Sequence, residues 1–132
     1  MGAKSTCVDS LAARDGGETF GSLRWDPALV EPICLAGVIR LTPTAEHGTA
    51  HLLFANPAST RRERLTVRLS ADGGHPWPVC RVLSAGPAAY SDLAVAPEGT
   101  MPCLCERGSA HPYETLTMAR FAPSWLTCDA AA

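Results

Sequence analysis

The chain has 132 residues, 46% of them hydrophobic, which is enough for one domain with a buried core. Its 11 basic and 13 acidic residues give a formal net charge of −2, with no basic block to neutralise a run of phosphates, so a nucleic-acid partner is not expected. No apolar run near the amino terminus is long enough for a signal peptide or a membrane span. These features predict no membrane span and, by default, a cytoplasmic location.

Short runs of β-branched, aromatic and aliphatic residues predict strands along almost the whole chain. The clearest is LTVRLS, where Leu65, Val67 and Leu69 alternate with polar residues, as in a half-buried strand. In chain order the predicted strands are 7–14, 21–26, 38–41, 51–57, 65–70, 78–84, 90–96, 101–106 and 114–121. Eleven prolines and eleven glycines separate them at the spacing of an antiparallel all-β domain. No amphipathic helix is expected.

Six cysteines could suggest a disulfide framework, but without an export signal we expect buried free thiols. Cys103 and Cys105 lie two positions apart, so on a strand they would share one face. No CxxC pair occurs, and the four histidines are not at ligand spacing near the cysteines. The sequence therefore predicts neither a metal site nor a cofactor.

One short pattern occurs twice, as ARDGGETF at residues 13–20 and as SADGGHPW at residues 70–77. In each copy we expect the aspartate to accept backbone N–H bonds within the turn, a glycine to supply a positive φ, and the aromatic ring to pack beneath the hairpin. The pattern residues are Asp15, Gly17 and Phe20 in the first copy, and Ser70, Asp72, Gly74 and Trp77 in the second. A repeat of this length, holding several short strands, is typical of propeller blades.

This pattern resembles the Asp-box of sialidases and other β-propeller proteins, in which it marks the fold and lies away from the active site. From Asp15 onward most of the chain resembles, in order, the final third of bacterial and animal exo-α-sialidases. The segments that carry the resemblance are DGGETF, DPALVEPICLAGVIRL, LLFANPAS, RRERLTVRLSADGG, WPVCRVLSAGPAAYSDLAVAPEGT, CLCERG and YETLTMARFAPSWL. On this resemblance Asp72 is a structural residue and not a catalytic one.

The resemblance implies an all-β fold, namely part of a six-bladed β-propeller with about two and a half blades of antiparallel strands. Residues 38–84 would form one blade of four strands, residues 90–121 the first three strands of the next, and the segment before Pro27 the last two strands of the preceding one. We expect an N-terminal segment at 1–12 with a residual blade strand, a propeller fragment at 13–127 and a tail at 128–132. Missing N-terminal blades are then an expected partner.

The resemblance also implies a catalytic tyrosine. Sialic acid carries a carboxylate on its anomeric carbon, so a carboxylate nucleophile would approach against like charge, and sialidases use a tyrosine activated by a glutamate instead. The motif AAYSDL identifies this nucleophile as Tyr90. Asp92, two positions on, could orient it or bind a neighbouring turn. Tyr113 in YETL aligns with a recurrent family tyrosine, with strand packing as the alternative.

Three arginines hold the substrate carboxylate in the family, because a guanidinium matches a carboxylate bidentately. The motif RERL implies that Arg62 is the third of them, with Arg61 and Arg64 as neighbours of no expected role. CLCE implies that Glu106 orients the first arginine, with a solvated glutamate as the alternative. The chain departs from the family at Leu35, where a glutamine is usual.

The other family residues, namely the acid/base aspartate, the glutamate that activates the tyrosine and the first two arginines, match no motif here. The sequence thus predicts a sialidase-like glycoside hydrolase, or a truncated piece of one, whose isolated chain has little or no activity on terminal α-linked sialic acids. The expected ligand is a sialoglycoconjugate or a free sialoside. The alternatives are a non-catalytic carbohydrate-binding or interaction module built of Asp-box blades, and a truncated reading frame without function of its own.

Overall fold

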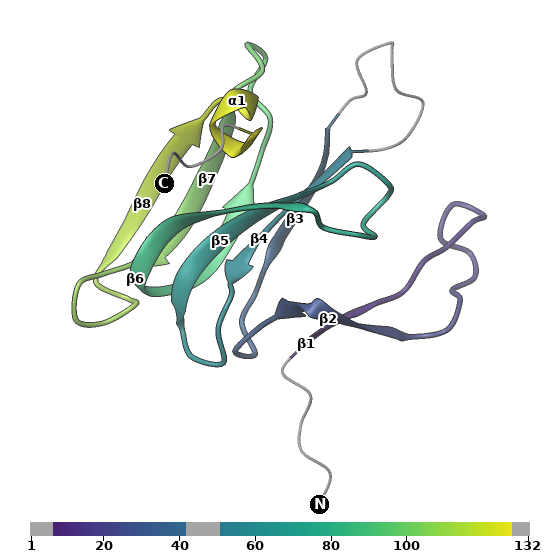
Figure 1. Ribbon diagram of the computed structural model, residues 1–132, viewed down its shortest axis with the longest axis horizontal. Helices are drawn as coiled ribbons and strands as arrows, with labels where there is room; N and C mark the ends of the chain where they lie inside the picture. The colour runs from purple at the N-terminus through teal and green to yellow at the C-terminus, as the bar shows by residue number, and fades with distance from the viewer. Residues whose placement is uncertain (1–6, 42–50, 128–132) are drawn as a thin grey trace, which may run out of the picture.

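The computed structural model describes residues 7–41 and 51–127 (Figure 1). Within them the chain forms β1 (Cys7–Ser10), β2 (Arg24–Val30), β3 (Gly37–Leu41), β4 (His51–Pro57), β5 (Glu63–Ser70), β6 (Val79–Leu93), β7 (Met101–Arg107), β8 (Thr115–Phe121) and α1 (Pro123–Thr127). β1 and β2 make a two-stranded sheet, and β3 to β8 make a six-stranded sheet in sequence order, with every pair antiparallel. No described helix is long and apolar enough to cross a membrane.

The longest strand, β6, belongs to two blades. Its first part pairs with β5 as far as Pro87, and its second part pairs with β7 from Ala88 onward. The prediction of two separate strands at 78–84 and 90–96 is wrong in this respect, because the chain stays extended through Ala85, Gly86 and Pro87 and changes partner within the strand. β3, β4, β5 and the first part of β6 form one blade, and the rest of β6 with β7 and β8 forms three strands of the next.

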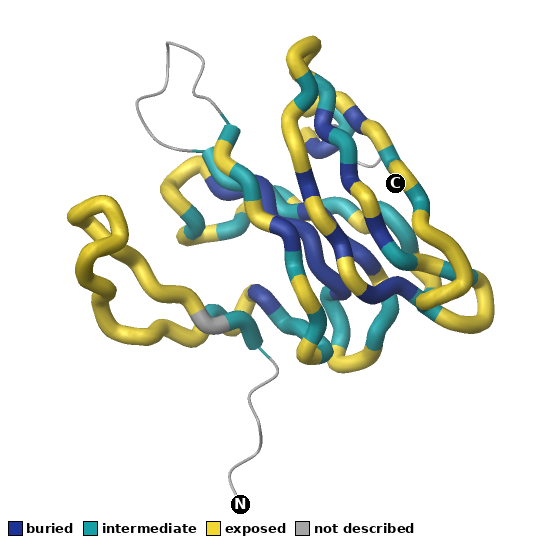
Figure 2. Tube along the Cα trace, turned by 180° about the vertical axis from the view of Figure 1, so that it is seen from behind, coloured by how far each residue is buried: buried dark blue, intermediate teal, exposed yellow. Residues whose placement is uncertain are grey.

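The core lies between these blades. Alternate residues of β7 are buried, and Cys103 and Cys105 share the buried face, as their spacing predicts. The other core members are apolar residues of β4 to β8 and α1: Leu53, Ala55, Leu65, Val67, Ala88, Leu93, Met101, Phe121 and Leu126. Figure 2 shows this buried band along the sheet, whereas the tip of the β1–β2 hairpin is exposed. The five described cysteines are free thiols, but the expectation that they are buried holds only for Cys103 and Cys105, since Cys7 and Cys34 are partly buried and Cys80 is exposed.

Polar contacts and one close backbone approach join the blades. The fully buried Asn56 of β4 donates to the Val30 carbonyl of β2 at 2.9 Å and accepts from Arg68 at 2.9 Å. The Ser91 hydroxyl of β6 donates to the Ala55 carbonyl at 3.2 Å. Gly37, the first residue of β3, lies so close to β6 that a Cβ would be 3.0–3.3 Å from the Asp92 and Leu93 backbone. These contacts fix the central blade against both neighbours.

The helix α1, which the sequence pattern did not predict, is a single turn that follows β8. It begins with Pro123, whose fixed φ suits the first helical position. Leu126 is buried, and the Trp125 ring packs on Phe121 at 4.9 Å between centroids. The Arg81 guanidinium lies 4.6 Å from the Trp125 ring centroid. Five residues are too few for a helical hydrophobic period, so packing rather than pattern selects this turn.

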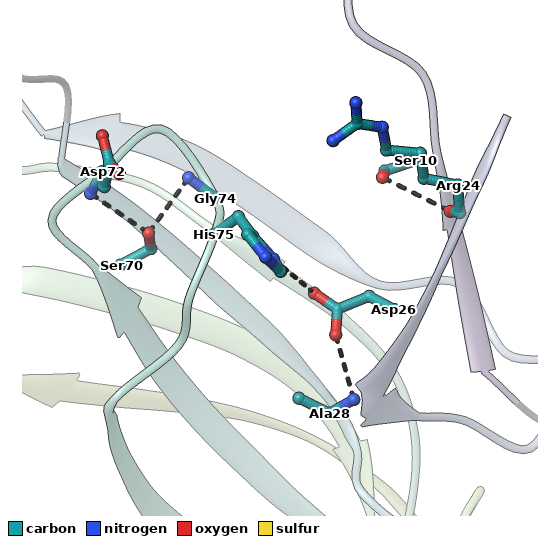
Figure 3. Close-up of polar contacts among 8 residues, drawn as sticks. All are labelled: Ser10, Arg24, Asp26, Ala28, Ser70, Asp72, Gly74 and His75. Atoms are coloured by element: carbon teal, nitrogen blue, oxygen red, sulfur yellow. Dashed lines mark hydrogen bonds and ion pairs between the residues drawn. The ribbon is translucent and has the colours of Figure 1, made fainter. Parts of the chain in front are cut away.

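The two Asp-box loops are closed by different side chains. In the first, the Asp15 carboxylate accepts the Thr19 amide at 3.1 Å and the Thr19 hydroxyl at 2.5 Å. In the second, the Ser70 hydroxyl accepts the amides of Asp72 at 3.3 Å and Gly74 at 3.0 Å (Figure 3). The expectation that Asp72 accepts the turn's N–H bonds is therefore corrected, since these bonds go to Ser70. Gly17 and Gly74 both have positive φ, at 97° and 102°.

The aromatic residues of the two boxes also differ. Trp77 packs on Phe54 of β4 with 5.7 Å between ring centroids. Phe20, in contrast, is 64% exposed, so the expectation of a ring packed beneath the hairpin is wrong for the first box. That hairpin is a sheet of only two strands, and the described chain has no third strand beside them on which Phe20 could pack. The second loop also approaches β2, where Asp26 lies 3.9 Å from His75 and accepts the Ala28 amide at 2.9 Å (Figure 3).

The close approach of β3 to β6 predicts that Gly37→Ala destabilises the fold. The added Cβ would meet backbone atoms that cannot rotate away, and such overpacking typically costs about 1–3 kcal/mol. Gly86→Ala is the matched control, because a Cβ there would have its nearest contact at an ordinary 3.5 Å. Urea unfolding of both variants checks this, and equal midpoints would contradict a tight blade contact at Gly37.

Candidate functional site

Three segments that are distant in sequence meet at the guanidinium of Arg62. Arg62 precedes β5, Tyr90 lies on β6, and Tyr113 lies in the β7–β8 loop. The Arg62 Cζ atom is 5.4 Å from the centroid of the Tyr90 ring and 5.7 Å from that of Tyr113. The guanidinium donates to the Tyr113 hydroxyl and, at 3.3 Å, to the Ile33 carbonyl. Two predicted site residues, Arg62 and Tyr90, thus lie together with Tyr113, for which the sequence leaves a site role and strand packing open.

A β-bulge brings the Tyr90 ring to the surface. Ala88 pairs with Arg107 and Ser91 pairs with Cys105, so Ala89 and Tyr90 together face a single residue of β7, Glu106. The extra residue breaks the alternation of buried and exposed positions: Ala88 and Ala89 are both buried, whereas Tyr90 is 45% exposed. Bulges commonly re-aim a side chain near a functional site in this way.

Glu106 completes the bulge. Its Oε2 atom accepts the Tyr90 backbone N–H at 3.2 Å, a donor that the irregular ladder leaves unpaired. The expected contact of Glu106 with an arginine is not among the interactions of the described residues, so that role stays a prediction. Asp92, which the sequence suggests could orient Tyr90 or bind a neighbouring turn, accepts the Leu93 amide on its carboxylate at 2.9 Å.

The neighbours of Arg62 differ from it in their surroundings. Arg61 forms an exposed ion pair with Glu63 at 2.9 Å, and Arg64 has a positive φ of 61° at an irregularity of the β5–β6 ladder. Arg62 alone of the three contacts the tyrosines. Its carbonyl accepts the Ala88 amide at 3.0 Å, which ties its backbone to β6 just before the bulge.

A strained turn supplies the carbonyl that Arg62 contacts. Ile33 has φ of 56°, a left-handed conformation that is costly for a β-branched residue. The turn is closed by the Glu31 carboxylate, which accepts the Cys34 amide at 2.9 Å. Backbone strain of this kind persists where surrounding contacts hold it and clusters at functional sites. Sequence patterns could not reveal this contribution, because it comes from a main-chain oxygen.

The electrostatics of the cluster keep the cation charged and the nearby thiol neutral. Partial burial lowers the pKa of Arg62, but Cys34, Tyr113 and Tyr90 outweigh this effect and raise it above its usual value. Burial raises the pKa of the Cys34 thiol, although the Arg62 charge opposes the shift. At neutral pH the cluster therefore presents a guanidinium beside a neutral thiol.

An open cavity of about 550 Å³ adjoins the cluster, lined by Tyr90 and by residues of β1, β2 and the β2–β3 connection, Ile33 among them. A smaller one of about 150 Å³ is lined by Tyr90 together with Glu106, Asp92 and Leu116. Tyr90 thus borders both hollows. In the described chain no group of three or more His, Cys, Asp or Glu residues could hold a metal ion.

Comparison with known proteins gives a consistent set of relatives. Over 121 residues the chain is 39% identical to a sialidase of Micromonospora viridifaciens, and the aligned region covers 89% of this chain and 19% of that protein. The intramolecular trans-sialidase from Ruminococcus gnavus, solved in complex with oseltamivir carboxylate, superposes with a TM-score of 0.77 at 19% identity, covering 95% of this chain and 30% of that one. A Hadza microbial sialidase superposes with a TM-score of 0.68 at 27% identity, covering 88% and 23%. No protein-family model matches the chain.

The chain is therefore a relative of the sialidases over one part of their length. It spans 19% of the length of the curated relative that it matches. The predicted fold class is confirmed: the described chain is an all-β assembly of antiparallel propeller blades.

The bulge geometry predicts that Glu106→Ala loosens the strand at Tyr90. Losing one partially exposed hydrogen bond costs about 1 kcal/mol, so the Tyr90 amide should exchange with solvent roughly fivefold faster. Glu106→Gln is the matched control, because its side-chain oxygen can still accept this N–H. Amide hydrogen exchange followed by NMR measures both. A Tyr90 amide that exchanges equally fast in all three proteins would mean that Glu106 does not support the bulge.

Proposed function

We propose that the chain is part of the catalytic propeller of a sialidase that removes terminal α-linked sialic acids with retention of configuration. Tyr90 would be the nucleophile, Arg62 a member of an arginine clamp on the sialic acid carboxylate, and Glu106 the residue that orients another member. The ligand would be a sialoglycoconjugate or a free sialoside. Neither a metal ion nor an organic cofactor takes part in this mechanism.

The unpaired charge of Arg62 is the observation that supports this proposal best. Two other arginines, Arg61 and Arg120, are paired with Glu63 and Glu98 at 2.9 Å. Among the described residues no carboxylate forms such a pair with Arg62, whose guanidinium instead meets two ring faces, a hydroxyl and a carbonyl. A cation that neutral groups hold in place beside a cavity is suited to an anionic ligand group.

The same geometry favours attack by Tyr90. In sialic acid the carboxylate is bonded directly to the anomeric carbon, so a carboxylate bound at Arg62 would bring that carbon close to the neighbouring phenol. The Tyr90 ring and the guanidinium are 5.4 Å apart, and the bulge exposes the ring. A free phenol has a pKa of about 10 and is mostly protonated at neutral pH, so Tyr90 needs a base to act as a nucleophile.

The 132 residues supply one clamp arginine and match no motif for the acid/base aspartate, the activating glutamate or the other two arginines. The chain alone would therefore have little or no activity, and N-terminal blades would supply these groups to the propeller part at 13–127. The second candidate function is a carbohydrate-binding module. It is favoured by the cavity that Tyr90 and Ile33, two contacts of Arg62, help to line, which could hold a sialoside without any of the absent carboxylates.

Substitution of Arg62 tests the proposed carboxylate contact. We expect Arg62→Ala to weaken binding of N-acetylneuraminic acid at least tenfold, since a charge-assisted pair contributes about 1.5–3 kcal/mol. Arg61→Ala is the matched control, because its side chain pairs with Glu63 and should leave the affinity unchanged. Titration followed by NMR measures weak affinities of this kind. Equal affinities of wild type and Arg62→Ala would refute the role of Arg62.

A fluorogenic sialoside tests the proposed inactivity and the nucleophile. The isolated chain should give no turnover above background, because the tyrosine lacks its base. Turnover that Tyr90→Phe abolishes would show that the chain does carry a complete set of catalytic groups. Binding without turnover, weakened by Arg62→Ala, is expected both of an inactive part of a sialidase and of the module, so turnover separates an active chain from these two.

A further inference from the structure

The β7–β8 loop is organised around a single carboxylate, that of Glu114. Its Oε1 atom accepts the amides of Ala110 at 2.9 Å and His111 at 2.8 Å, and its Oε2 atom accepts the amide of Ser109 at 3.0 Å and the Ser109 hydroxyl at 3.2 Å. These three consecutive amides point at one side chain. Glu114 therefore holds the loop closed much as a bound anion would.

The backbone bonds from Ser109, Ala110 and His111 lower the pKa of Glu114 to about 2. The carboxylate is ionised at all pH values near neutrality, so its hydrogen bonds are of the stronger, charge-assisted kind. The side chain is exposed, so the tight hold comes from the number and direction of its donors rather than from burial.

The loop has no room for a side chain at its first residue, Gly108. A Cβ on Gly108 would lie 2.0 Å from the His111 carbonyl oxygen and 2.7 Å from the Glu114 carboxylate. The Gly108 amide donates to the Pro87 carbonyl at 3.1 Å, which anchors the loop to β6 next to the point where β6 changes partner.

Tyr113 directly precedes Glu114, and contacts within the same loop hold it in place. Its amide lies 3.3 Å from His111 Nδ1, and the two rings pack edge to face with centroids 4.7 Å apart. From this seat the Tyr113 hydroxyl accepts a hydrogen bond from Arg62. A continuous set of contacts thus runs from the Glu114 carboxylate through the loop to the guanidinium.

We propose that Glu114 is a positioning residue for Arg62. The Glu114 carboxylate closes the β7–β8 loop, and the closed loop holds the Tyr113 hydroxyl against the Arg62 guanidinium. The benefit for ligand binding rests on the proposed function, in which Arg62 receives the substrate carboxylate. The coupling between loop and guanidinium does not rest on it, because it can be measured in the free protein.

Side-chain and amide NMR of the full chain tests the coupling. In Glu114→Gln an NH₂ group replaces one acceptor oxygen, so we expect the amides of Ser109, Ala110 and His111 to exchange at least tenfold faster. The Arg62 guanidinium signals, separate when rotation is hindered, should average at the same time. Tyr113→Phe should reproduce the averaging at Arg62 while leaving the three amides protected, which separates positioning from loop folding.

Glu98→Gln is the matched control. Glu98 is also an exposed glutamate in a hairpin turn, where it accepts from Thr100 at 2.6 Å and from Arg120 at 2.9 Å. This variant should change neither the loop amides nor the Arg62 signals.

Glu114→Gln should also weaken the binding of N-acetylneuraminic acid about fivefold. The binding of the methyl ester of that sugar, which lacks the carboxylate charge, should change little.

The outcomes separate this inference from the proposed function. Unchanged Arg62 signals in Glu114→Gln or in Tyr113→Phe would overturn the positioning role, whatever the ligand does. Averaged Arg62 signals with faster loop amides would support it even if Arg62→Ala showed that the sugar carboxylate does not bind at Arg62. In that case the proposed function would fail and the structural coupling would stand.

Discussion

The structure depends first on one strand that serves two blades. β6 pairs with β5 over its first part and with β7 over its second, so no loop separates these blades and their relative position is set within a continuous backbone. The bulge at Ala89 and Tyr90 lies just after this change of partner. The change of partner and the bulge that exposes the Tyr90 ring near Arg62 are therefore adjacent features of one strand.

The blade repeat explains why the site and the Asp-boxes lie apart. Arg62 precedes the third strand of its blade and Tyr113 precedes the third strand of the next, so both come from equivalent loops of successive blades. Asp72 follows the third strand, at the opposite end of β5. Eight strand residues span roughly 25 Å, and this length separates the Asp-box loop at Asp72 from Arg62, which contacts the cavity-lining residues Tyr90 and Ile33.

Local residue patterns in the sequence predict much of this strand arrangement. Cys103 and Cys105 share a buried face, as the geometry of a strand predicts. LTVRLS does form a strand, but the expected alternation of buried and exposed positions is wrong, because Thr66 and Ser70 are buried as well as Leu65 and Val67. The continuity of β6 could not be foreseen, because Gly86 and Pro87 are residues typical of turns. The environment of Phe20 depends on whether a further strand lies beneath its hairpin, which no local pattern encodes.

The candidate site divides in the same way. Motifs identified Arg62 and Tyr90 because family chemistry requires those side chains at those positions. The Ile33 carbonyl and the amides around Glu114 are main-chain groups, and their direction follows from backbone angles that any residue name leaves open. Sequence reasoning therefore finds candidate site side chains more readily than the main-chain groups that hold them.

Arg62 is supported from both sides by different blades. The Ile33 turn follows the preceding blade, and Tyr113 belongs to the following one, so the guanidinium is fully held only when three consecutive blades are packed together. That packing depends on contacts such as Asn56 with Val30 and Ser91 with Ala55, and none of these four residues lines the larger cavity. Because an arginine side chain is otherwise free to rotate, its orientation is a property of the blade interfaces. A change that loosens the blade interfaces should therefore also disturb the orientation of Arg62.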